Sequence, residues 1–384
     1  MAFPADYTLL QKITIDNTKV SGGANLTDFP VLITEDHIVS NTWSSTDDGG
    51  GDVRFSSDDA GATQLPCEVV SYDNSGETCE IWVKRTLDHD DDTIIYLWGD
   101  NTTETQPARD NAYGSDNVWN SNYEAVYHLE EASSTRYDST SNENNLTDNN
   151  TVDSSAGKIG TDADFGGTNQ YLGVSDNNTL DFADVVLERA DFTIQTFVNL
   201  DAKETNHAFV CKGDVLDDDA VNYLLDQSAI NGYKFVVSSS AGGSSKTPLS
   251  DSTDYSTGSW VLVHGTYKHS TTTMVLYTNG TQRATTSTIT KPIASNKGDL
   301  RLGCYAGNTS YTLDGKLDET RILSATLSSD WIATEYANQN APGTFATGAS
   351  VSDIKELSGV VIASIKKVAG VVIASVKKVA GVSN

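Results

Sequence analysis

The chain has 384 residues and a formal net charge of -28 at pH 7, with 25 Lys and Arg against 53 Asp and Glu. Such an acidic chain repels phosphate backbones, which excludes nucleic acid as a partner. No stretch approaches the ~18 apolar residues of a membrane-spanning helix, so we expect no membrane span. The length fits two domains and a tail, and the plentiful aromatic and β-branched residues between Gly, Ser, Thr, Asn and Asp predict an all-β fold.

Residues 1–110 alternate between short apolar runs and polar turns, which predicts an N-terminal β-sandwich. The turn Asp73–Gly76 joins two of its strands as a hairpin, and Cys67 and Cys79 flank that hairpin. Two alternatives stay open for these cysteines: a disulfide across the hairpin, or two separate thiols. The predicted strands are Gln11–Asp16, Phe29–Thr34, Asp52–Ser56, Leu65–Tyr72, Glu77–Arg85 and Thr93–Trp98.

The order of the motifs in this domain carries a resemblance. LTDFPVLI is followed by DVRF, then by LP-x-E, IWVK and IYLWGD. This series resembles a small β-sandwich family of uncharacterised function that often precedes laminin-G-like domains. The resemblance implies architecture and brings no catalytic residues.

Residues 111–123 are polar and are predicted to be a linker, and residues 124–345 form the predicted second domain. Asn279-Gly280 lies between two apolar runs, a strong hairpin signal because both turn positions need positive φ. The last core strand, Thr320–Leu323, leads to a short helix with Trp331, which Ser328 or Ser329 is expected to cap. With the ADFGG, DFTI, MVLYTNG and DETRI motifs in this order, the domain resembles a laminin-G-like, concanavalin-like jelly roll.

Residues 346–384 are predicted to be a separate tail. From Ile354 they read IKELSGVVIAS, IKKVAGVVIAS and VKKVAGVSN, a repeat with a period of 11 residues. This period is compatible with a right-handed coiled coil, but the Val/Ile density and recurring Gly favour short strands separated by turns. Because so short an apolar unit cannot bury itself, we expect residues 351–384 to form a homo-oligomer or to bind another protein. The repeats resemble those at the ends of tailed-bacteriophage appendage proteins, which implies other virion proteins as the partners.

The sequence contains no nucleophile, metalloprotease or phosphate-binding motif, and we assign no catalytic residue. The His residues fall at no metal-binding spacing, and His128 and His264 are interpreted as packed or surface residues. Glycosidases with a jelly-roll fold carry paired carboxylates on one strand, often as E-x-D-x-x-E, and that motif is absent. The adjacent Glu130 and Glu131 would point to opposite faces of a strand.

The resemblance to laminin-G-like domains implies a structural calcium ion. In that family calcium often lies near an early Asp-Ser-Thr-x-Asn loop and a late Asp-Glu strand. The matching positions are Asp138, Asn142 and Asp318, with Glu319 as a lesser candidate. In the alternative interpretation, Asp138 and Asn142 only form turns through local hydrogen bonds.

The same resemblance implies glycan binding, which requires an aromatic platform beside polar side chains. Four tyrosines near predicted loops are candidates for this platform, although each alone also fits a core or rim position. They are Tyr171, Tyr233, Tyr305 and Tyr311.

The first residues, MAFPADYTLLQKITID, lack the basic and apolar regions of a signal peptide. Together with the repeat tail and the missing active-site motifs, this favours a non-enzymatic virion structural or adhesion protein, a phage tail, fibre or capsid appendage that contacts a host-surface glycan or a protein. We expect it on the virion or outside the cell. The first alternative is a secreted bacterial or archaeal polysaccharide-binding surface protein, and the second is a glycan hydrolase.

Overall fold

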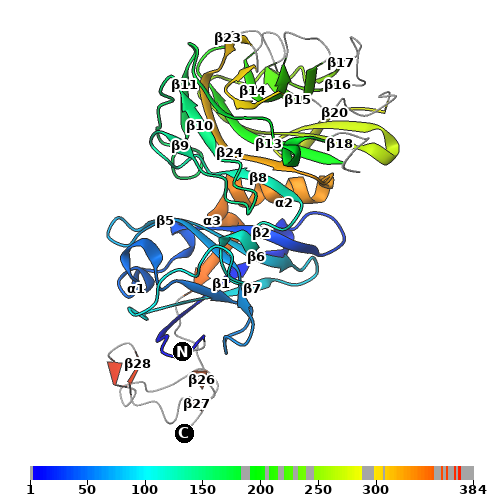
Figure 1. Ribbon diagram of the computed structural model, residues 1–384. Helices are drawn as coiled ribbons and strands as arrows, with labels where there is room; N and C mark the ends of the chain where they lie inside the picture. The colour runs from blue at the N-terminus through cyan, green and yellow to red at the C-terminus, as the bar shows by residue number, and fades with distance from the viewer. Residues whose placement is uncertain are drawn as a thin grey trace.

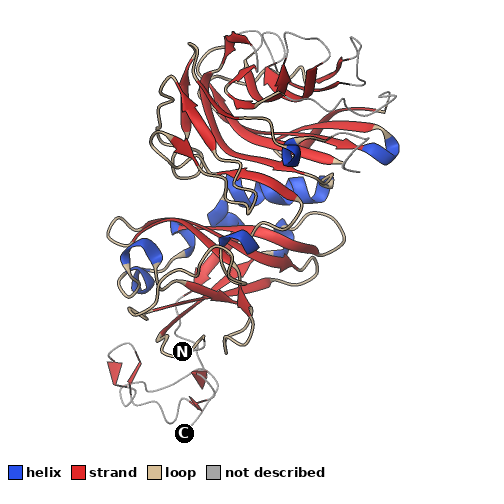
Figure 2. Cartoon of the chain, viewed as in Figure 1, coloured by secondary structure: helices blue, strands red, loops and turns tan. Residues whose placement is uncertain are grey.

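The protein consists of two β-rich domains with a helix between them (Figures 1 and 2). The prediction of an all-β fold is confirmed. None of the helices in the described part of the chain is long and apolar enough to cross a membrane. The computed structural model describes residues 3–182, 191–203, 207–214, 220–227, 232–238, 246–287, 298–305 and 308–349, and four two-residue strands in the tail.

The first domain is a sandwich of two antiparallel sheets. Alternating apolar residues of both sheets, such as Ile13, Phe29 and Ile81, form its core. One sheet has the order β25-β1-β7-β3-β4 and lies at the end remote from the second domain; the other has the order β2-β6-β5 and faces it (Figure 1). The strands are β1 (Leu9–Ile15), β2 (Leu26–Thr34), β3 (Arg54–Ser56), β4 (Gln64–Leu65), β5 (Cys67–Asp73), β6 (Thr78–Leu87), β7 (Thr93–Gly99) and β25 (Ala346–Ala349).

The strand β25 corrects the predicted boundary of the tail. The sequence predicts that residues 346–349 belong to the tail, but they pair with β1. Ala346 lies opposite Ile15, and Ala349 lies opposite Lys12. Phe345, assigned to the second domain, is buried in the core of the first. The chain therefore returns to the first domain before the tail begins.

The cysteines of the β5–β6 hairpin are not bonded to each other. Cys67 lies opposite Val83, whereas Cys79 lies opposite Tyr72, so the two are several residues out of register. Both are buried thiols. The disulfide alternative is therefore wrong for this structure.

The second domain is a jelly roll with an inner core between two large sheets. Phe192, Ile194 and Val198 of one sheet point inward and meet Phe209 and Leu302 of the other. The first sheet contains β11 (Ala163–Gly166), β24 (Asp314–Leu323), β13 (Phe192–Leu200), β18 (Trp260–Lys268), β19 (Thr273–Thr278) and β20 (Thr281–Thr286) in this order, and β8 (Tyr123–Tyr127) pairs with β24. The second contains β17 (Lys246–Ser250), β16 (Tyr233–Ser238), β15 (Ala220–Gln227), β14 (Ala208–Asp214), β21 (Leu300–Leu302), β12 (Tyr171–Val174), β10 (Leu146–Asn149) and β9 (Thr135–Arg136). β22 (Cys304–Tyr305) and β23 (Asn308–Thr312) form a separate pair.

Two local predictions for this domain are confirmed. Asn279 and Gly280 have φ of 48° and 73° and form the turn between β19 and β20. The helix α2 (Ser329–Asn340) begins after Ser328, whose Oγ accepts a hydrogen bond from Trp331 N at 3.1 Å. The short helix α3 (Pro342–Phe345) then leads into β25.

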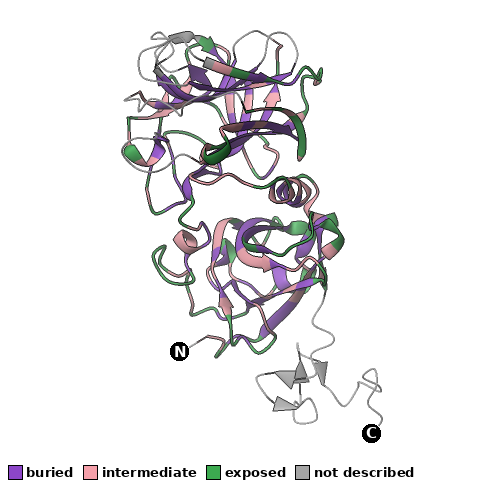
Figure 3. Ribbon diagram, turned by 90° about the vertical axis from the view of Figure 1, so that its right-hand side faces the viewer, coloured by how far each residue is buried: buried purple, intermediate pink, exposed green. Residues whose placement is uncertain are grey.

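The two domains share a third apolar cluster at their junction. Leu32 and Trp82 of the first domain, Trp119 of the predicted linker, and Phe197 and Leu262 of the second domain belong to it. The helix α2 lies between the two sandwiches, and buried residues occur in it as in both cores (Figure 3). The junction is therefore packed like a domain interior, which fixes the two domains relative to each other.

The remaining short helices lie in loops. They are η1 (Asn17–Lys19), η2 (Glu35–His37), α1 (Ser40–Trp43), η3 (Asp48–Gly50), η4 (Ser115–Asn117), η5 (Asn178–Leu180) and η6 (His269–Thr271).

In the tail, two antiparallel strand pairs repeat with the sequence period. β26 (Glu356–Leu357) pairs with β27 (Val360–Val361), and β28 (Lys367–Val368) pairs with β29 (Val371–Val372). Glu356 lies opposite Val361, and Lys367, which is 11 residues after Glu356, lies opposite Val372. The described strands thus follow the strand-and-turn prediction.

Candidate functional site

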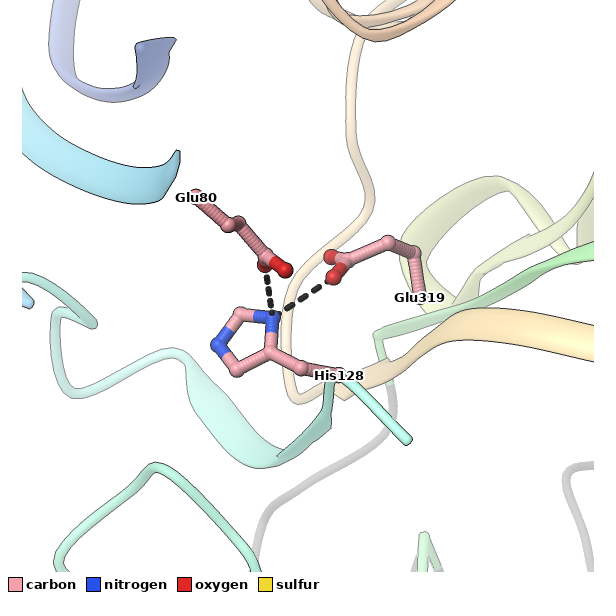
Figure 4. A group of neighbouring side chains, drawn as sticks. All are labelled: Glu80, His128 and Glu319. Carbon is pink, nitrogen blue, oxygen red and sulfur yellow. Dashed lines mark hydrogen bonds and ion pairs between the residues drawn. The ribbon is translucent and has the colours of Figure 1, made fainter. Parts of the chain in front are cut away.

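Three buried side chains from both domains converge where the domains meet (Figure 4). Glu80 comes from β6, Glu319 from β24, and His128 follows β8. His128 Nδ1 lies 2.6 Å from Glu319 Oε1 and 3.1 Å from Glu80 Oε1. The three potential ligand atoms all lie within 4.8 Å of one another. We call Glu80, His128 and Glu319 the interdomain triad.

The strand alternation of β6 directs Glu80 toward the second domain. Ile81 and Val83 enter the core of the first domain, so Glu80 and Trp82 point to the opposite face. Trp82 Nε1 donates a hydrogen bond to Glu80 Oε1 at 2.8 Å. The indole thereby fixes the carboxylate in the junction.

A bulge in β24 places Glu319 in the triad. The register between β13 and β24 shifts between Gln195 and Phe197, and Glu319 in the facing segment has a φ of 49°. A β-bulge re-aims side chains, and a positive φ in a residue other than Gly is a strained conformation that the surroundings must maintain. Here Arg321 Nη2 donates to Glu319 Oε2 at 2.5 Å and holds the carboxylate in place.

The imidazole of His128 is held on its other side by Glu68 of β5. His128 Nε2 lies 3.4 Å from Glu68 Oε2, which also accepts a hydrogen bond from Trp119 Nε1 at 2.6 Å. Each member of the triad therefore has a partner that orients it. This is the arrangement in which outer partners fix the ring and carboxylate positions of a metal or proton-transfer site.

Arg321 extends the network toward α2. Its guanidinium lies over the rings of Trp82 and Trp119, 4.3 Å and 4.8 Å from their centroids. Arg321 Nη1 donates to Glu335 Oε1 at 2.8 Å, and His264 Nε2 lies 3.1 Å from Glu335 Oε2. Arg321, Glu335 and His264 are buried, so their charges act on one another with little screening by water.

The electrostatics of the triad are dominated by burial and by mutual charges. Burial alone would raise the pKa of Glu319, but His128 and Arg321 lower it to about 2. Burial would lower the pKa of His128, but Glu319, Glu68 and Glu80 raise it well above its usual value. Burial raises the pKa of Glu80, although His128 opposes this.

The charges of the triad also affect the pKa values of two neighbouring carboxyl groups. Burial raises the pKa of Glu130 to about 8, and the charge of Glu80 adds to the effect. Burial also raises the pKa of Asp318 well above its usual value, with Glu319 adding to it. The junction thus concentrates more carboxyl groups than the neighbouring cations balance, so it has the capacity to hold protons or a cation.

The structure places the predicted calcium ligands in different surroundings. Asp138 accepts hydrogen bonds from the backbone N–H groups of Val126, Thr140 and Asn144 at 2.9–3.0 Å, which organises the loop. Asn142 Nδ2 donates to the Glu124 carbonyl oxygen at 3.1 Å.

On β24, Asp318 Oδ2 accepts from the backbone N–H groups of Lys158 and Ile159. Glu319 is the one predicted ligand that the interdomain triad contains. Calcium at the four predicted positions stays a prediction.

The four tyrosines predicted to form an aromatic platform lie at three separate places in the structure. Tyr305 and Tyr311 lie together, with ring centroids 5.3 Å apart, and Tyr311 is 38% exposed. Tyr171 lies beneath the Arg301 guanidinium at 4.3 Å. Tyr233 is buried in the jelly-roll core, so it has no ring face to offer a ligand and must be removed from the candidates.

Sequence reasoning missed the triad. Of the two interpretations of His128 and His264, as packed or as surface residues, the structure selects the packed one, since both are buried. Their acidic partners come from distant segments, and no spacing in the sequence reveals that. The available signal was Glu80 on the same strand face as Trp82, because a charge beside a large apolar side chain needs a partner when that face is buried.

Comparisons with known proteins agree with the fold of the second domain. Residues 166–333 match the family model described as the concanavalin A-like lectin/glucanases superfamily. None of the curated proteins matches the chain.

Several solved structures are similar. The binding domain of Paraclostridial Mosquitocidal Protein 1 is 15% identical with a TM-score of 0.46; the alignment covers 56% of this chain and 52% of that one, so this chain spans about half its length. Domain 4 of AbnA, a GH43 extracellular arabinanase from Geobacillus stearothermophilus, in complex with arabinotriose, is 17% identical (TM-score 0.40, 56% and 98% covered). The CBM40 of the Ruminococcus gnavus IT-sialidase, bound to alpha2,3 sialyllactose, is 15% identical (TM-score 0.36, 46% and 95% covered).

Proposed function

We propose that this protein is a non-enzymatic virion structural or adhesion protein of a phage. In this proposal the jelly roll binds a glycan or protein on the host surface, and residues 351–384 attach the protein to its own copies or to other virion proteins. The observation that carries the proposal is the pairing of β25 with β1. It puts Ala349, the last described residue before the tail, in the sheet of the first domain that lies remote from the jelly roll (Figure 1).

The packed junction supports this division of roles. An adhesin transmits position and force between its attached end and its binding end, so its domains must not swing freely. Trp82, Trp119 and Phe197 share one apolar cluster across the junction, and the charged network around Arg321 lies beside it. Separation of the domains would expose these large apolar side chains to water, which makes it costly.

The tail chemistry supports attachment. The repeated strand pairs β26–β27 and β28–β29 consist of Val, Leu, Lys and Glu, with an 11-residue period. A two-strand unit of this size is not stable in isolation and gains stability by stacking on copies of itself or on a partner. The tail is rich in Lys, whereas the rest of the chain is strongly acidic, which favours contact between the tail and acidic surfaces.

The triad does not support glycan hydrolysis. A glycosidase needs two carboxyl groups that flank a sugar bond in an open cleft. Glu80 and Glu319 are 1% and 0% exposed, and both are held by His128. A sugar ring has no access to them. The exposed candidate for sugar contact is Tyr311 beside Tyr305, where an aromatic face is open to solvent.

The test compares the full chain with a chain truncated after residue 349, which keeps β25. Light scattering should give a defined oligomer or larger assembly for the full chain and a monomer for 1–349. A glycan array probed with 1–349 should show binding that is weakened in Tyr311→Ala. If both chains are monomers and bind polysaccharide, the secreted surface-protein alternative replaces this one; cleavage of the glycans would establish a hydrolase.

A further inference from the structure

We propose that Glu80, His128 and Glu319 form a binding site for one divalent transition-metal cation of the Zn²⁺ class, which joins the two domains. The site is independent of the proposed host-binding function. It takes one ligand from the first domain and two from the second, so the cation would act as a clamp between them (Figure 4).

The distances in the triad suit a small cation. His128 Nδ1 lies 2.6 Å and 3.1 Å from the two carboxylate oxygens. A zinc ion with ligands at about 2.1 Å in tetrahedral geometry separates its ligand atoms by roughly 3.4 Å. The triad atoms therefore need to move apart by less than about 1 Å, which side-chain adjustment supplies. One imidazole nitrogen with two carboxylates favours Zn²⁺ over Ca²⁺, which prefers six or more oxygen ligands.

The surroundings of the triad already have the form of an outer shell. When Nδ1 binds a metal, the ring proton resides on Nε2, which faces Glu68 Oε2 at 3.4 Å. This is the carboxylate–histidine–metal arrangement common in metal sites. Glu319 is oriented by Arg321 and Glu80 by Trp82. None of these partners has to be rearranged for a cation to bind.

An unpartnered oxygen points to a missing positive charge. Glu80 Oε2 is buried and has no hydrogen-bond partner among the described residues, and the same holds for Asp318 Oδ1 nearby. Buried polar oxygens normally have partners, because leaving one without costs free energy. A cation in the triad would engage the carboxylate of Glu80 and supply the positive partner that its buried oxygen lacks. An ion pair with His128 alone leaves Glu80 Oε2 unsatisfied.

A cleft lies near the triad, which itself does not line the cleft. It has a volume of about 520 Å³ and lies between the domains, lined by Glu35 and Asp36 of the first domain and by Glu130 and Lys158 of the second. Glu130 is close enough to the triad for its pKa to respond to Glu80. Acidic walls raise the local concentration of cations. The triad itself is buried, so a bound cation should exchange slowly.

The experiment uses the tag-free full chain, freed of metal with a chelator and then incubated separately with Zn²⁺, Mn²⁺ and Ca²⁺. After removal of excess metal, elemental analysis should find one Zn²⁺ per chain. Glu80→Gln should bind Zn²⁺ at least tenfold more weakly. The control is Asp162→Asn, which removes another buried carboxylate, beside Ser155 and Lys316, and should bind Zn²⁺ as the wild type does.

X-ray absorption of the Zn²⁺-loaded wild type keeps the test independent of the folding of the variant. It should report an imidazole ligand together with carboxylate oxygens. The proposal is overturned if the wild type retains no Zn²⁺, if the absorption spectrum lacks an imidazole, or if Glu80→Gln binds as tightly as Asp162→Asn. Retention of Ca²⁺ alone, equally in both variants, would also overturn it and would favour the predicted calcium positions.

Discussion

The side-chain amide of Asn338 pairs with both backbone groups of Leu32. Leu32 N donates to Asn338 Oδ1 at 2.9 Å, and Asn338 Nδ2 lies 3.4 Å from the Leu32 carbonyl oxygen. Both residues are buried. The amide takes the place of a neighbouring strand at this point of β2, so α2 is attached to the first domain by strand-like hydrogen bonding.

Replacing Asn338 with Ala should therefore destabilise the protein. The change leaves the N–H and C=O groups of Leu32 buried without partners, which costs about 1–3 kcal/mol. Urea unfolding monitored by Trp fluorescence measures the loss. The control is Asn340→Ala at the exposed end of α2, which should change stability by less than about 0.5 kcal/mol. Equal effects of the two substitutions would mean that the Leu32 contact does not contribute.

The turn and the helix cap were predictable because each is determined by residues that are adjacent in the sequence. The Asn279-Gly280 turn and the Ser328 cap each depend on a few adjacent side chains, and both predictions are confirmed. The return of the chain to the first domain was not predictable. Ala346–Ala349 reads ATGA, which has little strand propensity, and it becomes a strand because Phe345 is buried beside it and β1 offers a free edge.

The candidate site escaped prediction for a related reason. Glu80 and Glu319 come together only where the two domains pack on each other, and charge pairing over such sequence distances leaves no periodic signal. The resemblance to laminin-G-like domains identified Glu319 but led to Asp138 and Asn142 as its companions, whereas the structure gives it His128 and Arg321.

Arg321 should be among the most sensitive positions of the chain. Replacing it with Met keeps most of the volume but removes the guanidinium that pairs with the buried carboxylates of Glu319 and Glu335. Breaking one partner out of a buried pair costs about 3–5 kcal/mol, and chemical denaturation should show a loss of this size.

Lys203 provides the comparison for Arg321, because it pairs with Asp254, which is 63% exposed. Water screens such a pair, so Lys203→Gln should cost less than about 1 kcal/mol. If Arg321→Met costs no more than Lys203→Gln, the buried network does not stabilise the fold.

Truncation after residue 345 should harm the first domain, whereas truncation after 349 should not. The shorter chain loses β25 and its four residue pairs with β1. Each net hydrogen bond contributes about 0.5–1.5 kcal/mol to stability, so at about one bond per residue pair we expect a loss of about 2–6 kcal/mol. Thermal unfolding of the two truncated chains, measured side by side, tests this. Equal unfolding midpoints would show that residues 346–349 belong functionally to the tail.

The chain should behave as a fully reduced protein. Cys67 and Cys79 are out of register across their hairpin, and burial raises the pKa of the Cys67 thiol to about 12. A thiol reagent should therefore react slowly with the native chain and should find all four cysteines after denaturation. Dithiothreitol should leave the thermal midpoint unchanged. Detection of only two thiols in the denatured, unreduced chain would show that Cys67 and Cys79 form a disulfide after all.

Asp226 should make the protein more stable as the pH falls toward 4. Burial raises the pKa of Asp226 to about 6, although Lys234 and the Tyr305 hydroxyl oppose this. The folded state binds the proton more tightly than the unfolded state, in which Asp has its ordinary pKa of about 3.9. The free-energy cost of burying the ionised carboxylate therefore disappears as the pH falls from 6 to 4.

Asp226→Asn, which resembles the protonated side chain, isolates this effect. The stability of the variant minus that of the wild type should grow as the pH rises from 4 to 7, by about 3 kcal/mol for two pKa units of difference. Subtracting the two curves removes the contributions of the other carboxyl groups, which both proteins share. A difference that does not change with pH would mean that Lys234, 2.9 Å from Asp226 Oδ2, fully offsets the burial of the carboxylate.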